Sequence, residues 1–432
     1  MRVWLINTDE PLPIDGENVR LRRVGILADY LAKQGHDVAW WTSTLDHWHK
    51  VQRFSRDTAL TLDNGCRVHV LHAVGYRKNI SLSRLLNHRL VARKFTRLAE
   101  KDLPPDAILC SYPTLDTSVA AVEYGRRANV PVVLDIRDLW PDIFLELAPA
   151  RTRGLARLVL SPMFSQARRA CSGAFAITGN SPAFVDFGLA YSGRERTDFD
   201  RDFPFGYNVC VFDSETRSQA VAFWEKLGVR EGTGAPIVCF FGSIGHQFDF
   251  ATVIEAARRI QPLRETQFIL CGKGDLLEKY RKEARDLPNV IFPGWIDASQ
   301  IWVLMEMSQF ALAPYKDGQN YEGNLTNKPI EYLAGGLPIL TSSKQGALRN
   351  LLEEHGCGVS YEGQSEKLVE LVCQLSDHRE RHNKMVQNAR KLFESRFVAS
   401  RVYGEMIDYL ERIAVEGRRV LPETDRKRLP RP

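Results

Sequence analysis

The chain has 432 residues, a formal net charge of +5 at pH 7, 44% hydrophobic residues and 26% charged residues. This length accommodates two or three domains, and the composition is typical of a globular protein with a large core, which excludes disordered and fibrous classes. The eight cysteines are scattered without a C-x-x-C pair, mostly in apolar runs, so we expect reduced core thiols and a cytoplasmic protein. No apolar run has the length of a membrane span, and the acidic pair Asp9-Glu10 argues against a signal peptide.

The first half alternates apolar runs of strand length with helical patterns. It begins with a predicted strand at Val3–Asn7, a helix at Val19–Gln34 and a strand at Asp37–Ser43. Further strands are predicted at Arg67–Leu71, Ala107–Ser111, Val132–Asp135 and Gly173–Thr178. This alternation predicts an α/β domain with a doubly wound sheet over residues 1–205.

Two loop features of this half have open interpretations. Gly16 follows the first strand at the sheet edge where open α/β sheets bind ligands, but it is equally well explained as an ordinary turn glycine. The polar, turn-rich stretch between Tyr191 and Asn208 predicts a linker. Within it, the D-x-D pair of Asp198 and Asp200 is better explained as solvated than as a metal site.

The second half repeats the alternation over residues 206–397. Strands are predicted at Ile237–Gly242, Gln267–Gly272, Val290–Gly294, Phe310–Tyr315, Ile339–Ser342 and Gly358–Tyr361. Several glycines cluster where these strands end, the positions that a nucleotide would approach. Residues 398–416 predict a helix that returns to the first domain, and residues 417–432 predict a disordered basic tail.

The stretch from Gly323 to Pro338 predicts a loop, a short helix and a strand. Thr326 or Asn327 can cap the helix, whose N-terminal amides and dipole favour an anion. Lys328 would add a positive charge, and Glu331 can accept hydrogen bonds from the vicinal hydroxyls of a ribose. A nucleotide site is one interpretation, and an ordinary capped helix with a solvated lysine and glutamate is the other.

Six motifs occur in a fixed order along the chain. They are Gly35–Val38, Asp135–Asp142, Phe241–Ser243, Gly272–Asp275, Asn289–Trp295 and the stretch from Gly323 to Pro338. Together they resemble the retaining glycosyltransferases of the GT-B fold, family 4, which includes bacterial polysaccharide and lipopolysaccharide sugar transferases. The N-terminal half is similar to the branch found in exopolysaccharide and O-antigen clusters, typified by WbuB-like enzymes. The residues that carry this similarity are Asp9–Pro11, Trp40–Ser43 and Tyr76–Ser81.

The resemblance implies two Rossmann-like domains facing a cleft, with a nucleotide-sugar donor on the C-terminal domain and the acceptor on the N-terminal domain. Glu331 matches the ribose-binding glutamate, the loop Gly323–Thr326 matches the one that meets the diphosphate or sugar, and Trp295 and Ile296 lie where the base is framed. The implied donor-binding residues are Gly16, Gly242, Ser243, Gly272, Lys273, Trp295, Ile296, Gly323, Asn324, Leu325, Thr326, Lys328 and Glu331.

The sequence departs from the family pattern at three places. Gly323 stands where the first carboxylate of the usual E-x7-E falls, with Glu322 one residue out of register. The stretch Ser243–Gln247 replaces the usual arginine and lysine that neutralise the diphosphate. Arg137 aligns with the family's histidine near the reacting sugar, so Arg137 and Asp138 are the predicted catalytic residues, with a role in orienting substrate.

The expected reaction is glycosyl transfer with retention, without a metal or other cofactor. The expected acceptor is a saccharide or a polyprenyl-diphosphate-linked sugar. The basic stretches Arg77–Lys101 and Arg151–Arg169 suit an anionic surface at the inner face of the cytoplasmic membrane, and equally suit solvated helix faces. A GT-B nucleotide-sugar epimerase and a non-catalytic glycosyltransferase-like partner protein are the alternatives, and nucleic-acid binding is disfavoured because no recognition module is present.

Overall fold

The computed structural model describes residues 1–16, 19–146, 148–229 and 234–420. The chain divides into two compact units: unit 1 consists of Met1–Pro204 and Ser400–Pro432, and unit 2 of Phe205–Ala399. Each unit is built on its own sheet, so the predicted α/β class is confirmed. Within the described ranges, no helix is both long and apolar enough to cross a membrane.

Unit 1 contains an eight-stranded sheet in the order β3-β4-β2-β1-β5-β6-β7-β8. The strands are β1 (Arg2–Ile6), β2 (Asp37–Ser43), β3 (Thr58–Thr61), β4 (Arg67–Leu71), β5 (Ala107–Tyr112), β6 (Val132–Ile136), β7 (Ala176–Gly179) and β8 (Arg201–Asp202). Among the strands of the described ranges, β3 alone is antiparallel to its neighbour. The order reverses at β1, where Leu5 lies between Trp40 and Leu109 in register. The carboxyl ends of β1 and β5 therefore flank the switch point, where a doubly wound sheet binds ligands.

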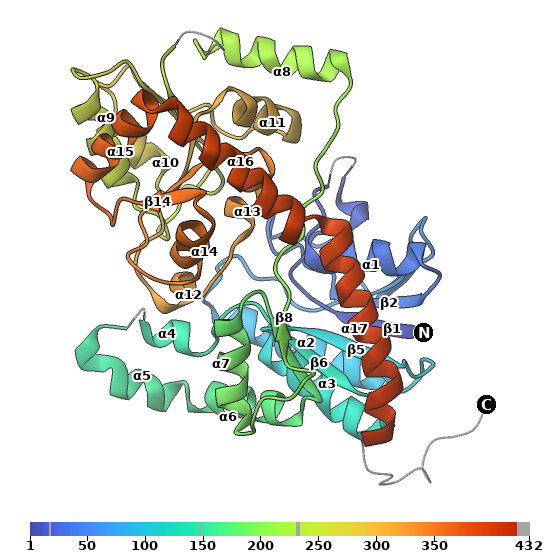
Figure 1. Cartoon of the computed structure of the whole chain (residues 1–432). Coiled ribbons are helices and arrows are strands. Elements are labelled where there is room, and N and C mark those ends of the chain that lie inside the picture. The colour runs from blue at the N-terminus through green and yellow to red at the C-terminus, as the bar shows by residue number, and fades with distance from the viewer. Residues whose placement is uncertain (17–18, 147, 230–233, 421–432) are drawn as a thin grey trace. The chain divides into compact units, whose positions relative to one another are not determined.

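Helices cover both faces of this sheet. They are α1 (Arg23–Lys33), α2 (Leu82–Ala99), α3 (Leu115–Ala128), α4 (Asp142–Glu146), α5 (Arg153–Val159), α6 (Ser161–Gly173), α7 (Pro182–Ser192) and α17 (Ala399–Val420), with short 3-10 turns η1 (Pro13–Asp15) and η2 (Ala150–Thr152). Trp4 and Trp41 pack against Phe95 of α2 on one face. On the other face, α1 is close enough for Gly25 to lie against Trp40. The C-terminal helix α17 packs on α1 through Tyr403 and Tyr30, whose rings are 5.7 Å apart (Figure 1).

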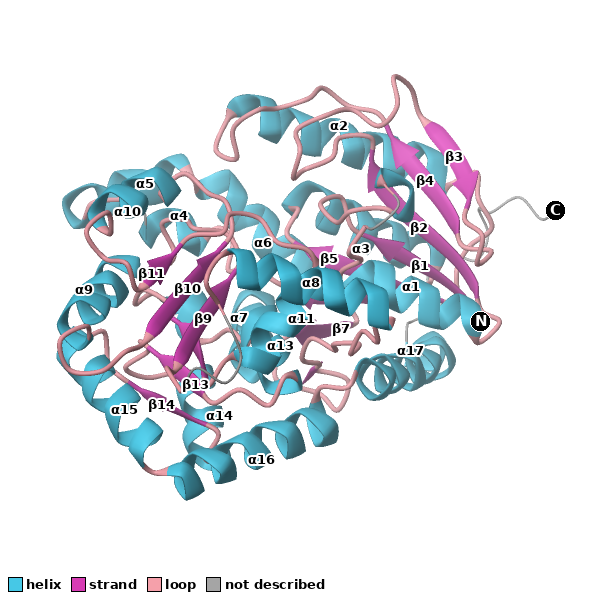
Figure 2. Cartoon of the chain, turned by 90° about the horizontal axis from the view of Figure 1, so that it is seen from above, coloured by secondary structure: helices cyan, strands magenta, loops and turns pink. Residues whose placement is uncertain are grey.

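Unit 2 contains a six-stranded parallel sheet in the order β11-β10-β9-β12-β13-β14. Its strands are β9 (Ile237–Phe241), β10 (Gln267–Cys271), β11 (Val290–Ile291), β12 (Phe310–Ala313), β13 (Ile339–Thr341) and β14 (Gly358–Ser360). Its helices are α8 (Ser214–Lys226), α9 (Phe250–Ile260), α10 (Leu277–Glu283), α11 (Ala298–Met307), α12 (Gln319–Glu322), α13 (Asn327–Ala334), α14 (Ala347–His355), α15 (Ser365–Asp377) and α16 (Arg379–Arg396). Figure 2 shows β9 and β10 with α9 on one side and α11 and α13 on the other. The switch point of this sheet lies between β9 and β12.

Three predictions about element boundaries are wrong. The first helix begins at Arg23, four residues later than expected, because Arg22 is extended and the Glu10 carboxylate accepts the amides of Val24 and Gly25. Most of the expected linker, up to Pro204, is part of unit 1, where β8 pairs with β7, and unit 2 begins at Phe205. The last helix continues to Val420, so the expected tail from 417 begins at the earliest after that residue, and residues 421–432 lie outside the described ranges.

The predicted thiol environment is confirmed at six of the eight cysteines. Cys66, Cys110, Cys171, Cys239, Cys271 and Cys357 are buried. Cys373 is half-buried and Cys210 is exposed. Burial raises the pKa of the Cys110 thiol to about 12, so this thiol is protonated and inert at neutral pH.

Candidate functional site

Two glycines of unit 2 allow the loops after β9 and β10 to pack backbone to backbone. A Cβ at Gly272 would lie 1.6 Å from the carbonyl oxygen of Gly242, and one at Gly274 would lie 2.2 Å from that of Ile244. Gly272 also has a φ of +141°, which favours glycine. Neighbouring backbone therefore requires both glycines, and the assignment of Gly272 to donor binding stays a prediction.

Gly242 accommodates the side chain of Lys328. A Cβ at Gly242 would lie 1.9 Å from Lys328 Cε, so the lysine crosses the carboxyl end of β9. Its ammonium group is 5.2 Å from the centre of the Phe248 ring. Lys328 belongs to the first turn of α13, where Thr326 is the N-cap and hydrogen-bonds the Tyr315 hydroxyl after β12. The switch point of unit 2 thus receives a lysine and a helix N-terminus, which both favour an anion.

Glu331 lies one turn further along α13 and is only 4% exposed. Its neighbours Ile330 and Tyr332 are buried in the core of unit 2, so the helix holds this carboxylate in a fixed place. A carboxylate held in this way can accept hydrogen bonds from the hydroxyls of a ligand. Lys328 and Glu331 are therefore brought together on one short helix, as the sequence predicted.

The remaining predicted donor residues occupy different environments. Ser243 is exposed and its hydroxyl accepts a hydrogen bond from Gln247 (3.0 Å). Lys273 is exposed, and its carbonyl accepts the Ile244 amide (2.8 Å). The Trp295 side chain is 70% exposed, whereas Ile296 is buried in the core and offers a ligand only its backbone.

The loop before α13 contains the position of the missing family carboxylate. Gly323 and Asn324 are half-buried, and Leu325 is buried. The Glu322 carboxylate accepts a hydrogen bond from Gln345 Nε2 (2.9 Å), and its carbonyl lies where a Cβ at Gly346 would be 2.2 Å away. Glu322 is therefore engaged by the loop that precedes α14, and nothing in this geometry gives it the role of the absent carboxylate.

In unit 1, Arg137 follows β6 and forms an ion pair with Glu10, which follows β1. The second Glu10 oxygen accepts the amides of Val24 and Gly25 at 2.9 and 3.2 Å. Burial alone would lower the pKa of Arg137, but the charges of Glu10 and Asp135 and the hydrogen bond to Glu10 together raise it. Arg137 is therefore a fixed cation beside the switch point, and Asp138, half-buried, is the next residue.

Arg23 forms a second, fully buried ion pair. Its guanidinium donates to both oxygens of Asp135 (2.8 and 3.1 Å) and to the carbonyls of Phe203 and Pro204 (2.9 and 3.0 Å). Both side chains of the pair are 1% exposed. This pair ties β6, α1 and the end of unit 1's first segment together, so its role is structural.

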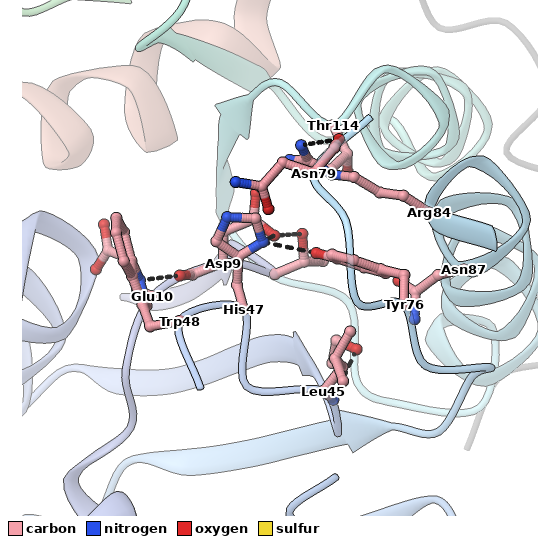
Figure 3. A network of polar contacts seen from close by, with 12 residues as sticks. Asp9, Glu10, Leu45, His47, Trp48, Tyr76, Asn79, Arg84, Asn87 and Thr114 are labelled. Atoms are coloured by element: carbon pink, nitrogen blue, oxygen red, sulfur yellow. Dashed lines mark hydrogen bonds and ion pairs between the residues drawn. The ribbon is translucent and has the colours of Figure 1, made fainter. Parts of the chain in front are cut away.

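A polar cluster beside Glu10 was not predicted from the sequence. It consists of Asp9, His47, Trp48, Tyr76 and Arg84, which come from the loops after β1, β2 and β4 and from α2 (Figure 3). Two sequence signals point toward it: each loop residue follows a predicted strand, and Asp9 and Tyr76 belong to segments that carry the family resemblance. Gly16, by contrast, is exposed at the end of η1, next to residues 17–18, which lie outside the described ranges.

In a comparison with known proteins, each unit matches a glycosyltransferase family model. The family model "Glycosyl transferase 4-like domain" matches residues 21–198, and the model "Glycosyl transferases group 1" matches residues 226–392. The O-antigen chain mannosyltransferase C of Escherichia coli is 26% identical over 211 residues, which are 45% of this chain and 50% of that protein. The chain thus matches about half the length of this curated relative.

Several solved structures share the whole fold. Sucrose-phosphate synthase from Thermosynechococcus elongatus has a TM-score of 0.69 at 17% identity, covering 96% of this chain and 99% of that one. Anabaena HepE in complex with UDP and glucose has a TM-score of 0.65 at 16% identity (95% and 99% covered). WaaG, a glycosyltransferase involved in lipopolysaccharide biosynthesis, has a TM-score of 0.63 at 14% identity (94% and 99% covered). The chain belongs to the GT-B glycosyltransferases of family 4.

Proposed function

We propose that this protein transfers a sugar, with retention, from a nucleoside diphosphate sugar to an acceptor hydroxyl in bacterial surface polysaccharide synthesis. The observation that carries the proposal is the switch point of unit 2, where Lys328 crosses Gly242 and Glu331 lies one turn further along α13. A cation and a helix N-terminus beside a fixed carboxylate suit a diphosphate joined to a ribose. The names of the O-antigen mannosyltransferase and of the UDP-bound HepE structure agree with this substrate class.

The hard step in such a reaction is departure of the diphosphate. Its developing negative charge would be met by Lys328 and by the amides of the loop Gly323–Thr326. Preorganised donors of this kind stabilise a transition state by several kcal/mol. We propose that they replace a divalent metal ion and that the departing phosphate oxygen takes the acceptor's proton. Arg137 and Asp138 on unit 1 are our candidates for orienting the reacting groups.

The test is the affinity of Glu331→Ala for UDP, GDP and dTDP, measured by calorimetry. We expect a loss of nucleotide affinity with an unchanged melting temperature. The matched control is Glu370→Ala, because Glu370 is an exposed glutamate of α15 that accepts only a Gln374 hydrogen bond among the described residues. Unchanged affinity in Glu331→Ala would remove the ribose role.

Two other functions would give different experimental results. An epimerase would convert a nucleotide sugar to its C2-inverted form without any acceptor. NMR of the donor incubated with the protein alone would detect this product. A non-catalytic partner protein would bind no UDP-, GDP- or dTDP-sugar. The paired Arg137 and the placement of Lys328 favour the enzyme that transfers sugar over the non-catalytic relative.

We also propose that unit 1 binds an anionic membrane surface through α5. Leu155, Leu158 and Val159 are 66–71% exposed, and Arg151 and Arg157 are exposed beside them. Exposed leucines that insert shallowly beside arginines suit an anionic lipid surface, where a lipid-linked acceptor would lie. In α2, the exposed apolar residues are Leu82, Leu85 and Leu86.

The basic stretch of α2 is less exposed than the sequence suggested. Arg84 points inward onto the Trp140 ring at 4.9 Å, and Lys94 pairs with Asp57 at 2.7 Å. Vesicle co-sedimentation tests the membrane surface. Leu155→Asp/Leu158→Asp should release the protein from anionic vesicles at low salt, whereas Leu263→Asp, at a leucine of unit 2 that is 68% exposed, should not. Absence of binding by the unaltered protein would refute this surface.

A further inference from the structure

The loop after β2 presents a tryptophan in a fixed position on the surface of unit 1. Trp48 is 52% exposed, yet its indole Nε1 donates to the Asp9 carbonyl (3.0 Å), and the Arg22 guanidinium lies 3.9 Å from the ring centre. The buried Asp46 carboxylate accepts the amides of Trp48 and His49 (2.7 and 3.0 Å), which fixes the turn. A half-exposed aromatic ring that is held this firmly is preorganised to contact a ligand.

Hydrogen-bonding groups lie next to this ring. Figure 3 shows Asp9, His47 and Tyr76 pointing toward one another, with Trp48 beside Asp9. The Tyr76 hydroxyl and His47 Nδ1 are 2.6 Å apart, and among the described residues no group bonds to His47 Nε2. The Asp9 carboxylate is 29% exposed, and its Oδ1 accepts a hydrogen bond from the Thr8 hydroxyl (3.2 Å). The nearest nitrogens of His47 and Arg84 are 3.9 and 3.7 Å away, too far for direct hydrogen bonds. Asp9 therefore retains acceptor capacity for a ligand.

The charge state of the cluster suits neutral hydroxyl groups. Burial lowers the pKa of His47 although Asp9 opposes the shift, so the imidazole is neutral at pH 7 and its two nitrogens form one donor and one acceptor. Groups outside the cluster engage Arg84, because its Nε donates to His88 Nε2 (3.3 Å) and its Nη1 donates to the Asn79 carbonyl (2.9 Å). The site offers an aromatic face, a carboxylate and a neutral imidazole at the switch point of the sheet.

We infer that Trp48, Asp9 and His47 form a saccharide-binding subsite for the acceptor. A pyranose ring would pack its C–H bonds, which carry positive partial charge, on the indole face opposite the Arg22 guanidinium. Its hydroxyls would donate to Asp9 and exchange hydrogen bonds with His47. This inference rests on the proposed function for the identity of the ligand as an acceptor, while the residues that form the subsite all belong to unit 1.

The test uses the full chain and the methyl glycosides of glucose, mannose, galactose and N-acetylglucosamine as probes. Saturation-transfer NMR should detect at least one glycoside bound to the unaltered protein, and Trp48→Ala should weaken it about tenfold or more, the usual effect of removing an aromatic anchor. The matched control is Trp302→Ala, a half-buried tryptophan of unit 2 whose indole donates to Glu306 (2.9 Å). Asp9→Asn, which keeps the side-chain shape, should also weaken binding.

Each outcome decides the inference. Binding by none of the glycosides, or equal binding by the unaltered protein and Trp48→Ala, would overturn it. Melting temperatures of all variants identify a loss of fold, and in that case Asp9→Asn alone decides. UDP, GDP and dTDP binding, measured on the same samples, separates the two proposals: glycoside binding without nucleotide binding would refute the transferase and leave the subsite standing.

Discussion

Replacing Lys328 by methionine tests the donor site most directly, because the substitution removes the charge and keeps most of the side-chain length. At about 4 Å and an effective dielectric constant of about 20, two unit charges attract by about 4 kcal/mol. Desolvation of the half-buried ammonium offsets part of this attraction, and hydrogen bonds to charged groups contribute about 1.5–3 kcal/mol net. We therefore expect Lys328→Met to weaken nucleoside diphosphate binding about 10- to 100-fold.

Gly242→Ala supplies an independent test of the same geometry. Its Cβ would lie 1.9 Å from Lys328 Cε, so the lysine must move away from the end of β9. We expect a similar loss of affinity and, in the double variant, no further loss, because both changes remove one interaction. The assay is calorimetry with UDP, GDP and dTDP, with Lys279→Met as the control at an exposed lysine of α10. Unchanged affinity in Lys328→Met, or fully additive losses in the double variant, would refute the reasoning.

Three further predictions concern stability and thiol chemistry. Arg23→Met leaves the buried Asp135 carboxylate without its ion pair and should lower the free energy of unfolding by about 3–5 kcal/mol in urea titrations; a loss within error would refute a structural role for the pair. Burial lowers the pKa of His88 to about 4 from 6.5, so between these values only the unfolded chain binds the proton. Stability should therefore fall by about 3 kcal/mol as the pH drops through that window, and less in His88→Gln, as urea midpoints at several pH values would report. In a disulfide-exchange assay of the native protein, Cys210 should react first and Cys210→Ser should remove the fast phase, because Cys210 is the exposed thiol among the eight.

The strands were predictable because buried parallel strands are continuous apolar runs, and β2 and β4 coincide with their predicted ranges. The start of α1 was not, since the carboxylate that caps it belongs to Glu10, fourteen residues before Val24. The residues next to a helix start do not reveal a capping partner that is distant in the sequence.

The stretch before Asn208 was misread for a related reason. Its charged residues suggest solvent, but Arg194 neutralises the buried Asp200 at 2.6 Å, and Asp200 also accepts the Ile177 amide of β7. The composition of a segment shows how many charged residues it has, but it does not show which of them form ion pairs in the folded protein. The same limit hid the cluster of Asp9, His47 and Tyr76, whose members come from three separate loops.

The residues at the switch point of unit 1 differ in chemistry from those at the switch point of unit 2. Both sheets reverse their order beside the first strand of the unit, so each unit offers a ligand the same position. In unit 2 this position receives Lys328 and the N-terminus of α13, which favour a diphosphate. In unit 1 it receives Asp9 and Glu10, with Arg137 held by Glu10, beside a neutral imidazole and an aromatic ring. Glu10 already engages Arg137, while Trp48 and His47 offer neutral hydroxyls an aromatic face and an uncharged imidazole. The corresponding positions of the two units therefore suit different groups, the charged leaving group in unit 2 and the acceptor that we propose in unit 1.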